Sequence, residues 1–300
     1  MKKKLIVIEG PTASGKTALG VELAIHFKTE IISADSRQFF KELAIGTAKP
    51  SKIEQKEIVH HFVDSHSIDD EISSSVYAKQ VEILLTELFQ KNEVVIMVGG
   101  SGMYIDAVCI GLDSIPHSKE IQAELNTSLE QFGLNNLLEE LALKDPVFYE
   151  SVDKANAMRI IRALEAILIT GEKMSDLQKK ELPKKEFEVI RFVINHERSV
   201  LYDRINRRVD QMIENGLIDE VKSVFDKREL KVLKTVGYSE LFQFLEDEIS
   251  LERAVELIKQ NTRRYAKRQL TWFRRHTEAY WLAHTSLDEM KIEVIDYLSE

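Results

Sequence analysis

LIVIEGPTASGKT, residues 5–17, is the stretch that decides the fold. An apolar run, 5–8, enters a glycine-bounded loop, 10–16, and Thr17 opens a predicted helix. This order of strand, loop and helix is the setting in which G-x-x-x-x-G-K-[ST] marks a phosphate-binding loop. Backbone N–H groups in such a loop converge on phosphate oxygens, and the helix N-terminus adds partial positive charge. The segment therefore predicts a site for a di- or triphosphate.

The residue types in this loop have predicted tasks. Lys16 brings a mobile cation to the phosphate, and the hydroxyl of Thr17 is the expected ligand of Mg2+. The predicted diphosphate-binding residues are Gly10, Pro11, Thr12, Ala13, Ser14, Gly15, Lys16 and Thr17. A glycine turn before an ordinary helix is the alternative, but the strand before the loop and the helix after it argue against that interpretation.

Length, composition and charge bound the class of protein. The chain has 300 residues, of which 44% are hydrophobic, enough for one core with an insertion or for two domains. The single cysteine, Cys109, permits neither an intrachain disulfide nor a Cys/His zinc site, and is expected to be a small buried hydrophobe. The first apolar run is too short for a signal peptide, and no stretch reaches the ~18 apolar residues of a membrane span. We expect a soluble, cytoplasmic monomer.

Strand and helix signals alternate in the first part of the chain. Buried strands are predicted at 5–8, at 31–32 and at 94–98, with helices at 17–27 and 77–89 between them. This alternation predicts an α/β fold with a doubly wound parallel sheet and with ligands at the carboxyl ends of its strands.

The pattern changes after Pro116. Leucines then repeat at helical spacing with a break at Gly133, and a second helix from Asn156 to Thr170 is predicted to stop at Gly171. A strand follows at 187–195, and the later helices are predicted at 199–215, 217–227 and 250–275. We expect a P-loop kinase-like three-layer core with C-terminal helices, residues 1–115 and 187–300, and a helical insertion domain, residues 116–186.

Polar residues follow the second strand, in IISADSRQ. That end of the sheet faces the same crevice as the phosphate loop, so residues 35–38 would line an acceptor side. The carboxylate of Asp35 suits a general base, and the amide of Gln38 suits an adenine edge. A turn or helix cap is the alternative for Asp35. The third strand ends in Gly99-Gly100, without the magnesium-holding aspartate typical of motor ATPases. The function classes that remain are a small-molecule kinase and another enzyme that uses a pyrophosphate group.

Basic residues concentrate in 263–276, RRYAKRQLTWFRRH. The net charge is −9, yet this segment holds six Lys/Arg and no Asp/Glu. On a helix they form two adjacent rows opposite the apolar face, namely Arg263, Lys267 and Arg274 beside Arg264, Arg268 and Arg275. The rows suit a phosphate backbone, and they equally suit a solvated face paired with acidic side chains. Tyr265 and Trp272 lie on the apolar face and are predicted to be core residues.

Smaller clusters are less informative. Arg159 and Arg162 form a second, weaker basic site on the insertion helix. Four arginines crowd the start of the 199–215 helix, and spacing does not say which of them reaches a pyrophosphate: Arg198, Arg204, Arg207 and Arg208. The adjacent His60 and His61 are expected to pack or to form hydrogen bonds, because neighbouring loop side chains rarely chelate one ion.

Eight segments, in order, resemble the bacterial tRNA dimethylallyltransferases. They are GPTASGKT (10–17), IISADSRQFF with IGTAKP (31–50), HHFVD (60–64), GGSGMYI (99–105), RIIRALE (159–165), LYDRINRRVDQMIENGLIDEV (201–221), TVGYSEL (235–241) and TRRYAKRQLTWFRR (262–275). The resemblance spans most of the chain. It implies a phosphate-loop core with a helical insertion, and transfer of a dimethylallyl group from dimethylallyl diphosphate to the exocyclic amine of an adenosine adjacent to the anticodon in tRNA.

The resemblance also implies roles for individual residues. Asp35 would be the general base, Lys16 and Arg208 would hold the diphosphate with Thr12, and Ser101 would complete the catalytic set. The tRNA contacts would come from Asp35, Ser36, Arg37, Gln38, Ser101, Gln122, Met158, Arg159, Ile160, Ile161 and Arg162. The basic rows add Arg264 and Arg268 to that set. Ser101 stands where the family usually has Thr, and Gln122 where many relatives have Arg.

Three other functions stay open at this point. An ATP-dependent small-molecule kinase or a free-nucleotide prenyltransferase can be built on the same P-loop core. A nucleotide-dependent RNA-binding protein without catalysis is the third, and it leaves Asp35 without a role. The basic segment and the insertion favour a macromolecular acceptor.

Overall fold

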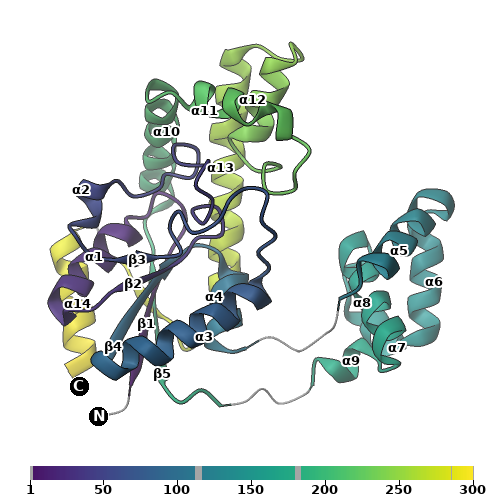
Figure 1. Ribbon diagram of the computed structural model, residues 1–300, viewed down its shortest axis with the longest axis horizontal. Coiled ribbons are helices and arrows are strands. Elements are labelled where there is room, and N and C mark those ends of the chain that lie inside the picture. Colours follow the sequence, from purple (N-terminus) through teal and green to yellow (C-terminus); the bar gives the residue numbers. More distant parts are fainter. Residues whose placement is uncertain (1–2, 112–116, 180–183, 285, 300) are drawn as a thin grey trace. The chain divides into compact units, whose positions relative to one another are not determined.

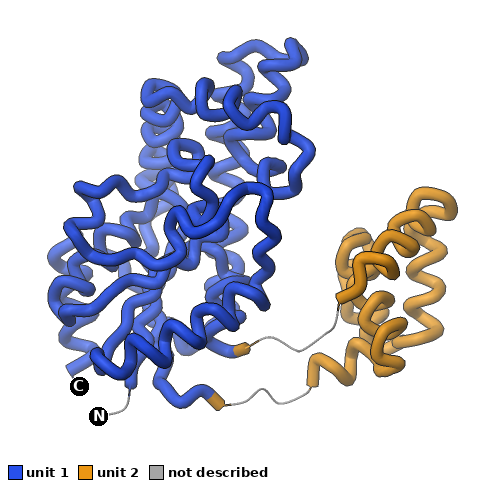
Figure 2. Tube along the Cα trace, in the orientation of Figure 1, with its two compact units in different colours: residues 1–110, 185–300 blue, residues 111–184 orange. Residues whose placement is uncertain are grey.

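The structure is a computed structural model that describes residues 3–111, 117–179, 184–284 and 286–299. The chain forms two compact units, residues 1–110 with 185–300, here unit 1, and residues 111–184, here unit 2 (Figure 2). None of the helices in the described part of the chain is both long and apolar enough to cross a membrane.

A six-stranded parallel sheet lies at the centre of unit 1, in the order β3-β2-β4-β1-β5-β6 (Figure 1). The strands are β1 (Lys4–Glu9), β2 (Ile31–Ala34), β3 (His60–His61), β4 (Val94–Gly99), β5 (Glu188–Ile194) and β6 (Tyr280–Leu282). Glu9 pairs with Gly99 on one side and Val193 on the other, so the phosphate loop leaves the middle of the sheet. The predicted α/β fold with a parallel sheet is confirmed. The short edge strands β3 and β6 were not predicted, because so few residues show no periodicity.

Helices cover both faces of this sheet. Leu5 and Val7 of β1 face a core shared with α3 (Ser74–Lys91) and α4 (Gly102–Cys109). Ile6 and Ile8 point to the opposite face, which α1 (Lys16–Phe27) and α14 (Leu287–Ser299) cover. Residues 5–8 of β1 are therefore buried on one face or the other, as a doubly wound sheet requires.

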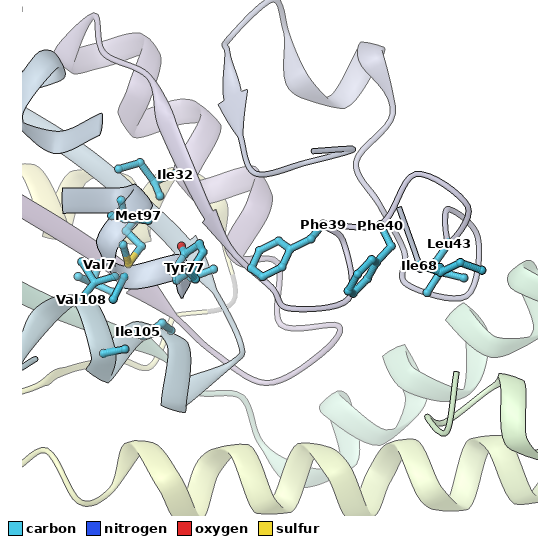
Figure 3. Close-up of a cluster of buried hydrophobic side chains, with 14 of the residues drawn as sticks. Val7, Ile32, Phe39, Phe40, Leu43, Ile68, Tyr77, Met97, Ile105 and Val108 are labelled. Atoms are coloured by element: carbon cyan, nitrogen blue, oxygen red, sulfur yellow. The ribbon is translucent and has the colours of Figure 1, made fainter. Parts of the chain in front are cut away.

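The segment after β2 is fixed by the first of these cores (Figure 3). The ring of Phe39 stacks on Tyr77, with centroids 5.2 Å apart. The Tyr77 hydroxyl donates to the carbonyl of Ser33 at 2.8 Å, inside β2 itself. Burial of this aromatic cluster holds the chain on both sides of Asp35. The short helix α2 (Lys52–Gln55) follows farther along.

The α-helices between β5 and β6 are α10 (Arg198–Glu214), α11 (Leu217–Ser223), α12 (Tyr238–Leu245) and α13 (Leu251–Phe273). The side chain of Ser250 caps α13 by accepting a bond from the Arg253 N–H. The predicted helix over 217–227 is wrong in its second half, where the chain forms a 3-10 turn, Phe225–Lys227. Helices α4, α12 and α14 were not predicted.

Unit 2 is helical and has its own core. Its helices are α5 (Lys119–Phe132), α6 (Leu134–Lys144), α7 (Pro146–Ser151), α8 (Ala157–Thr170) and α9 (Met174–Leu177). Gly133, with φ 78°, separates α5 from α6. The side chain of Asn156 caps α8, and Gly171, with φ 71°, ends it. These start and stop signals were predicted correctly from the sequence.

Candidate active site

A cavity of about 380 Å³ lies in unit 1 beside the phosphate loop. Its walls come from segments far apart in the sequence, among them Thr12 and Lys16, residues 35–37, residues 46–48, residues 100–104, helix α10, residues 235–237 and helix α13. Several residues proposed from the sequence share it: Thr12, Lys16, Asp35, Ser36, Arg37, Ser101, Arg208 and Arg268. The fold thus collects in one place the groups that sequence reasoning assigned to phosphate and acceptor.

The phosphate loop is braced from outside. Ala13, with φ 64°, and Gly15, with φ 94°, give it its curvature. The Arg204 Nε donates to the carbonyl of Ala13 at 2.8 Å, and the His196 Nε2 lies 2.7 Å from the carbonyl of Ser14. These contacts, from the segment after β5 and from α10, hold the loop in its curved conformation.

Gln269 of α13 is a third brace and was missed as a functional residue. Its Oε1 accepts from the Thr12 N–H at 2.9 Å, and its Nε2 donates to the carbonyl of Gly100 at 2.8 Å. Gln269 is buried, and its bond to Gly100 lies away from water. The available signal was a polar residue on the otherwise apolar face of a predicted helix.

Lys16 and Arg208 form the cationic part of the cavity. Burial lowers the pKa of Lys16 to about 8, against the opposing attraction of Asp35, and the charge of Arg208 lowers it further. Burial and the neighbouring Arg204 also lower the pKa of Arg208. Two cations close together and shielded from water repel each other, and a bound diphosphate would offset both charges. Of the four crowded arginines, Arg208 lines the cavity and Arg204 bonds to the phosphate loop.

Asp35 lines the same cavity and also caps a turn. Its Oδ1 accepts from the Arg37 N–H at 3.2 Å. The Ser101 hydroxyl accepts from the Ser36 N–H at 3.0 Å and donates to the Ser36 hydroxyl at 3.1 Å. These bonds join the segment after β2 to the start of α4, so the backbone next to Asp35 is held by both segments.

Thr17 and Gln38 lie outside this cavity. They line a recess of about 20 Å³, which Lys16, Asp35 and His60 also border. The Gln38 amide nitrogen donates to the carbonyls of Thr47 and Ala48, at 3.2 and 3.3 Å. In this structure Gln38 therefore supports the 46–48 wall of the cavity, and its reading of adenine stays a prediction.

The central turns of α13 face the cavity as well. Tyr265 was predicted to be a core residue, but it is 37% exposed and lines the cavity, so that prediction is wrong. Helix α13 packs against α10, α12 and α4, and the side of the helix that carries Tyr265 borders the cavity. Burial and the charge of Asp35 raise the pKa of the Tyr265 hydroxyl to about 12. Trp272 is half-buried, and its Nε1 donates to Asp106 at 2.7 Å.

The basic rows of α13 are not neutralised by carboxylates. None of the six side chains forms an ion pair with an acidic residue in the described ranges. The Arg263 Nη1 donates to Asn206, the Arg264 Nη1 donates to Asn261, and Arg275 lies 4.6 Å from the ring centroid of Trp272. Earlier in the helix the pattern differs. Lys259 pairs with Asp210 at 2.6 Å and Arg253 with Glu256 at 3.0 Å. The interpretation as an acid-paired face is therefore wrong.

Unit 2 carries the other predicted RNA contacts. Met158 is 52% exposed and Arg159 is exposed, whereas the Arg162 Nη1 donates to Glu165 at 2.7 Å. Ile160 and Ile161 are fully buried in the core of this unit, so their side chains cannot reach RNA, and the predicted contact is corrected for both. Neighbouring residues of a helix point to different sides, so the predicted run of contacts at 158–162 includes both core and surface positions. Gln122 is half-buried on α5.

The remaining candidates are structural. Burial raises the pKa of the Cys109 thiol to about 12, so it is a buried hydrophobe, as expected. The His61 Nε2 pairs with Glu30 at 2.6 Å, and the His60 Nδ1 lies 2.9 Å from the carbonyl of Ile58. Within the described residues, no three His, Cys, Asp or Glu side chains are placed to hold a metal ion together.

Comparison with protein families and with solved structures gives consistent matches. The model of the family described as IPP transferase matches residues 38–276. The tRNA dimethylallyltransferase of Christiangramia forsetii is 47% identical over 299 residues, which cover 99% of this chain and 98% of that protein. The tRNA dimethylallyltransferase 1 of Bacteroides fragilis is 43% identical over 297 residues, covering 99% and 97%.

Two solved structures extend the likeness to the fold. The tRNA isopentenylpyrophosphate transferase of Bacillus halodurans has a TM-score of 0.74 at 35% identity, covering 99% of this chain and 96% of that one. A eukaryotic dimethylallyltransferase described as acting on tRNA has a TM-score of 0.84 at 25% identity, covering 99% and 77%. The resemblance noted in the sequence motifs is confirmed. The chain belongs to the IPP transferase family.

Proposed function

We propose that this chain transfers a dimethylallyl group from dimethylallyl diphosphate to the exocyclic amine of an adenosine adjacent to the anticodon in tRNA, and releases pyrophosphate. The observation that carries the proposal is the shared cavity of Lys16, Arg208 and Asp35. Its lining also includes the apolar side chains of Met103, Ile205, Val209, Met212, Val236 and Ile258. Phosphate-binding groups and apolar side chains in one cavity suit a donor that is half diphosphate and half hydrocarbon.

The chemistry follows from these groups. The bond between the allylic carbon and the diphosphate oxygen breaks while the carbon–nitrogen bond forms, and the electron pair leaves with the pyrophosphate. Lys16, Arg208 and the loop N–H groups stabilise that growing negative charge. The adenine amine is too weak an acid to be deprotonated first, so its proton passes to Asp35 as the new bond forms.

Magnesium is part of the proposal. Thr17 borders the small recess beside Lys16, so its hydroxyl is available next to the diphosphate position, while the carboxylate of Asp35 is kept for the proton. Mg2+ retains several waters and is commonly held through substrate phosphates, which the donor would supply. Bound there, the ion would neutralise charge on the leaving group.

The acceptor side rests on the unpaired basic rows and on the relatives. Arg268 lies at the cavity and Arg264 continues the same row, which supports assigning RNA phosphates to these two side chains. The similar proteins are named as tRNA enzymes. In unit 2 we assign further RNA contacts to Met158, Arg159 and Arg162, with Gln122 as a weaker candidate. An adenosine in a single-stranded loop can be unstacked to reach Asp35.

Mass spectrometry of digested nucleosides tests the proposal. The protein is incubated with dimethylallyl diphosphate, magnesium and unmodified tRNA, and an adenosine heavier by one dimethylallyl group is expected. A parallel reaction with ATP and no prenyl donor tests the kinase alternative. Unmodified nucleosides together with ATP consumption would reject the proposal. That the chain acts as a cytoplasmic monomer stays a prediction, and light scattering after size-exclusion chromatography checks its oligomeric state.

A further inference from the structure

Glu220 of α11 is the centre of an unusual set of hydrogen bonds. Its Oε2 accepts from the backbone N–H groups of Ala44 and Ile45, at 2.8 and 2.7 Å. Its Oε1 accepts from the Gly46 N–H at 2.9 Å and from the Tyr238 hydroxyl at 2.6 Å. One carboxylate thus receives four donors, three of them backbone groups far away in the sequence. Bonds to an ionised acceptor are stronger than neutral ones.

The two segments that Glu220 joins are walls of the cavity. Residues 46–48 form one wall, and residues 235–237, directly before Tyr238, form another. Both walls are turns outside the sheet, so no strand ladder fixes them. The ring of Tyr238 also packs on Gly46, where an added Cβ would meet Cε2 at 2.6 Å. The carboxylate and this close ring contact together set the spacing of the two walls.

The 46–48 wall belongs to the acceptor side of the cavity. Gln38 donates to the carbonyls of Thr47 and Ala48, and Gln38 follows Asp35 in the same segment. A displaced wall would therefore change where an adenosine sits relative to Asp35. The braces of the phosphate loop come from His196, Arg204 and Gln269 and do not involve Glu220.

We propose that Glu220 is a positioning residue for prenyl transfer, which seats the acceptor adenosine against Asp35 by holding these two walls together. The inference rests on the proposed function. It separates acceptor placement from donor binding, because Glu220 bonds to residues 44–46 and Tyr238 and to none of the braces of the phosphate loop.

The test compares variants for kcat, for the KM of tRNA and for the Kd of dimethylallyl diphosphate. Glu220→Gln puts an amide N–H₂ against backbone N–H donors, and kcat is expected to fall about 10- to 100-fold, the effect of displacing reacting groups by about 1 Å. The donor Kd should stay within about twofold of wild type, because the phosphate loop is independent. Gly46→Ala keeps the carboxylate but forces the wall off Tyr238, and should show the same signature.

Two matched variants complete the design. Tyr238→Phe leaves the three backbone bonds, so its loss in kcat should be smaller than that of Glu220→Gln. Asp219→Asn changes the neighbouring carboxylate, which is 85% exposed, and should behave as wild type. Thermal unfolding is followed for every variant.

The outcomes separate the two proposals. If the wild type modifies tRNA and Glu220→Gln has the same kcat, the role of Glu220 is overturned while the proposed function stands. A parallel loss of donor binding and folding in both Glu220→Gln and Gly46→Ala makes the contact merely structural and also overturns it. Absence of modified adenosine with the wild type rejects the proposed function, and this inference with it.

Discussion

At the scale of single residues, Asp35 uses its two carboxylate oxygens differently. Oδ1 accepts the turn bond from Arg37, whereas Oδ2 forms no hydrogen bond to any residue that the structure describes. A turn cap was the alternative to a catalytic role for Asp35, and the two roles are therefore compatible. The turn orients the carboxylate and leaves one oxygen for a proton.

Asp35→Asn is expected to lower turnover about 10²- to 10⁴-fold while tRNA binding persists, because an amide keeps the turn but accepts no proton. Single-turnover prenylation and filter binding of tRNA measure the two quantities separately. Asp219→Asn is the control carboxylate change. Turnover near that of wild type would remove Asp35 from the mechanism.

Lys16 gives a prediction for pH. Its pKa is lowered to about 8, so the ammonium is charged below that pH and becomes neutral above it. Donor binding needs the charged form, so affinity for dimethylallyl diphosphate should be highest below pH 8 and should fall as the pH rises through it. An ordinary lysine would keep its charge to about pH 10.

Calorimetric titrations from pH 6.5 to 9.5, at constant magnesium, check this dependence; these limits bracket the pKa of about 8. Lys16→Arg carries a charge that does not titrate in this range, so its binding should be flat with pH. A falling affinity in that variant would assign the pH dependence to another group.

At the scale of elements, α13 combines three contacts in one helix. Gln269 braces the phosphate loop, Tyr265 lines the cavity, and the basic rows form no ion pair with a described carboxylate. A helix repeats every 3.6 residues, so a single rigid element can present all three faces at fixed angles. If the rows hold RNA, as we propose, this rigid helix would place that RNA relative to the donor site.

Replacing Arg264 and Arg268 together by Gln should weaken tRNA binding and reduce its salt dependence. Each phosphate contact releases counterions on binding, so fewer are released when contacts are lost. The slope of log affinity against log salt should flatten by about 0.7 per contact. Arg253→Gln, on the same helix but paired with Glu256, is the control. A slope unchanged in the double variant would mean that the two arginines touch no phosphate.

At the scale of the whole molecule, the chain is two compact units with separate cores. Leu141 is fully buried in the unit 2 core, whereas Leu143, on the same helix, is 85% exposed. Leu141→Ala should destabilise unit 2 by about 2–5 kcal/mol, because a cavity remains in its core. The donor Kd, set in unit 1, should stay within about twofold of wild type.

Thermal unfolding and calorimetry of both variants check this independence. Leu143→Ala should change neither quantity, because an exposed side chain leaves no cavity. Loss of donor binding in Leu141→Ala would show that the two units fold as one cooperative block.

The sequence by itself determined what depends on neighbours a few residues apart. The strand, loop and helix of residues 5–17, the cap at Asn156 and the stop at Gly171 follow from local backbone chemistry. The ordered motifs also led to the family, and the alternation of strands and helices led to the parallel sheet.

Only the tertiary structure decided which distant side chains meet. Gln269 reaches Thr12 across 257 positions, and Glu220 reaches the 44–46 backbone across 174 to 176. It also placed Tyr265 in the cavity and Ile160 in a core. Spacing along the chain carries no record of such pairs, because the energy of a contact depends on separation in space and on burial, which exist only once the chain has folded.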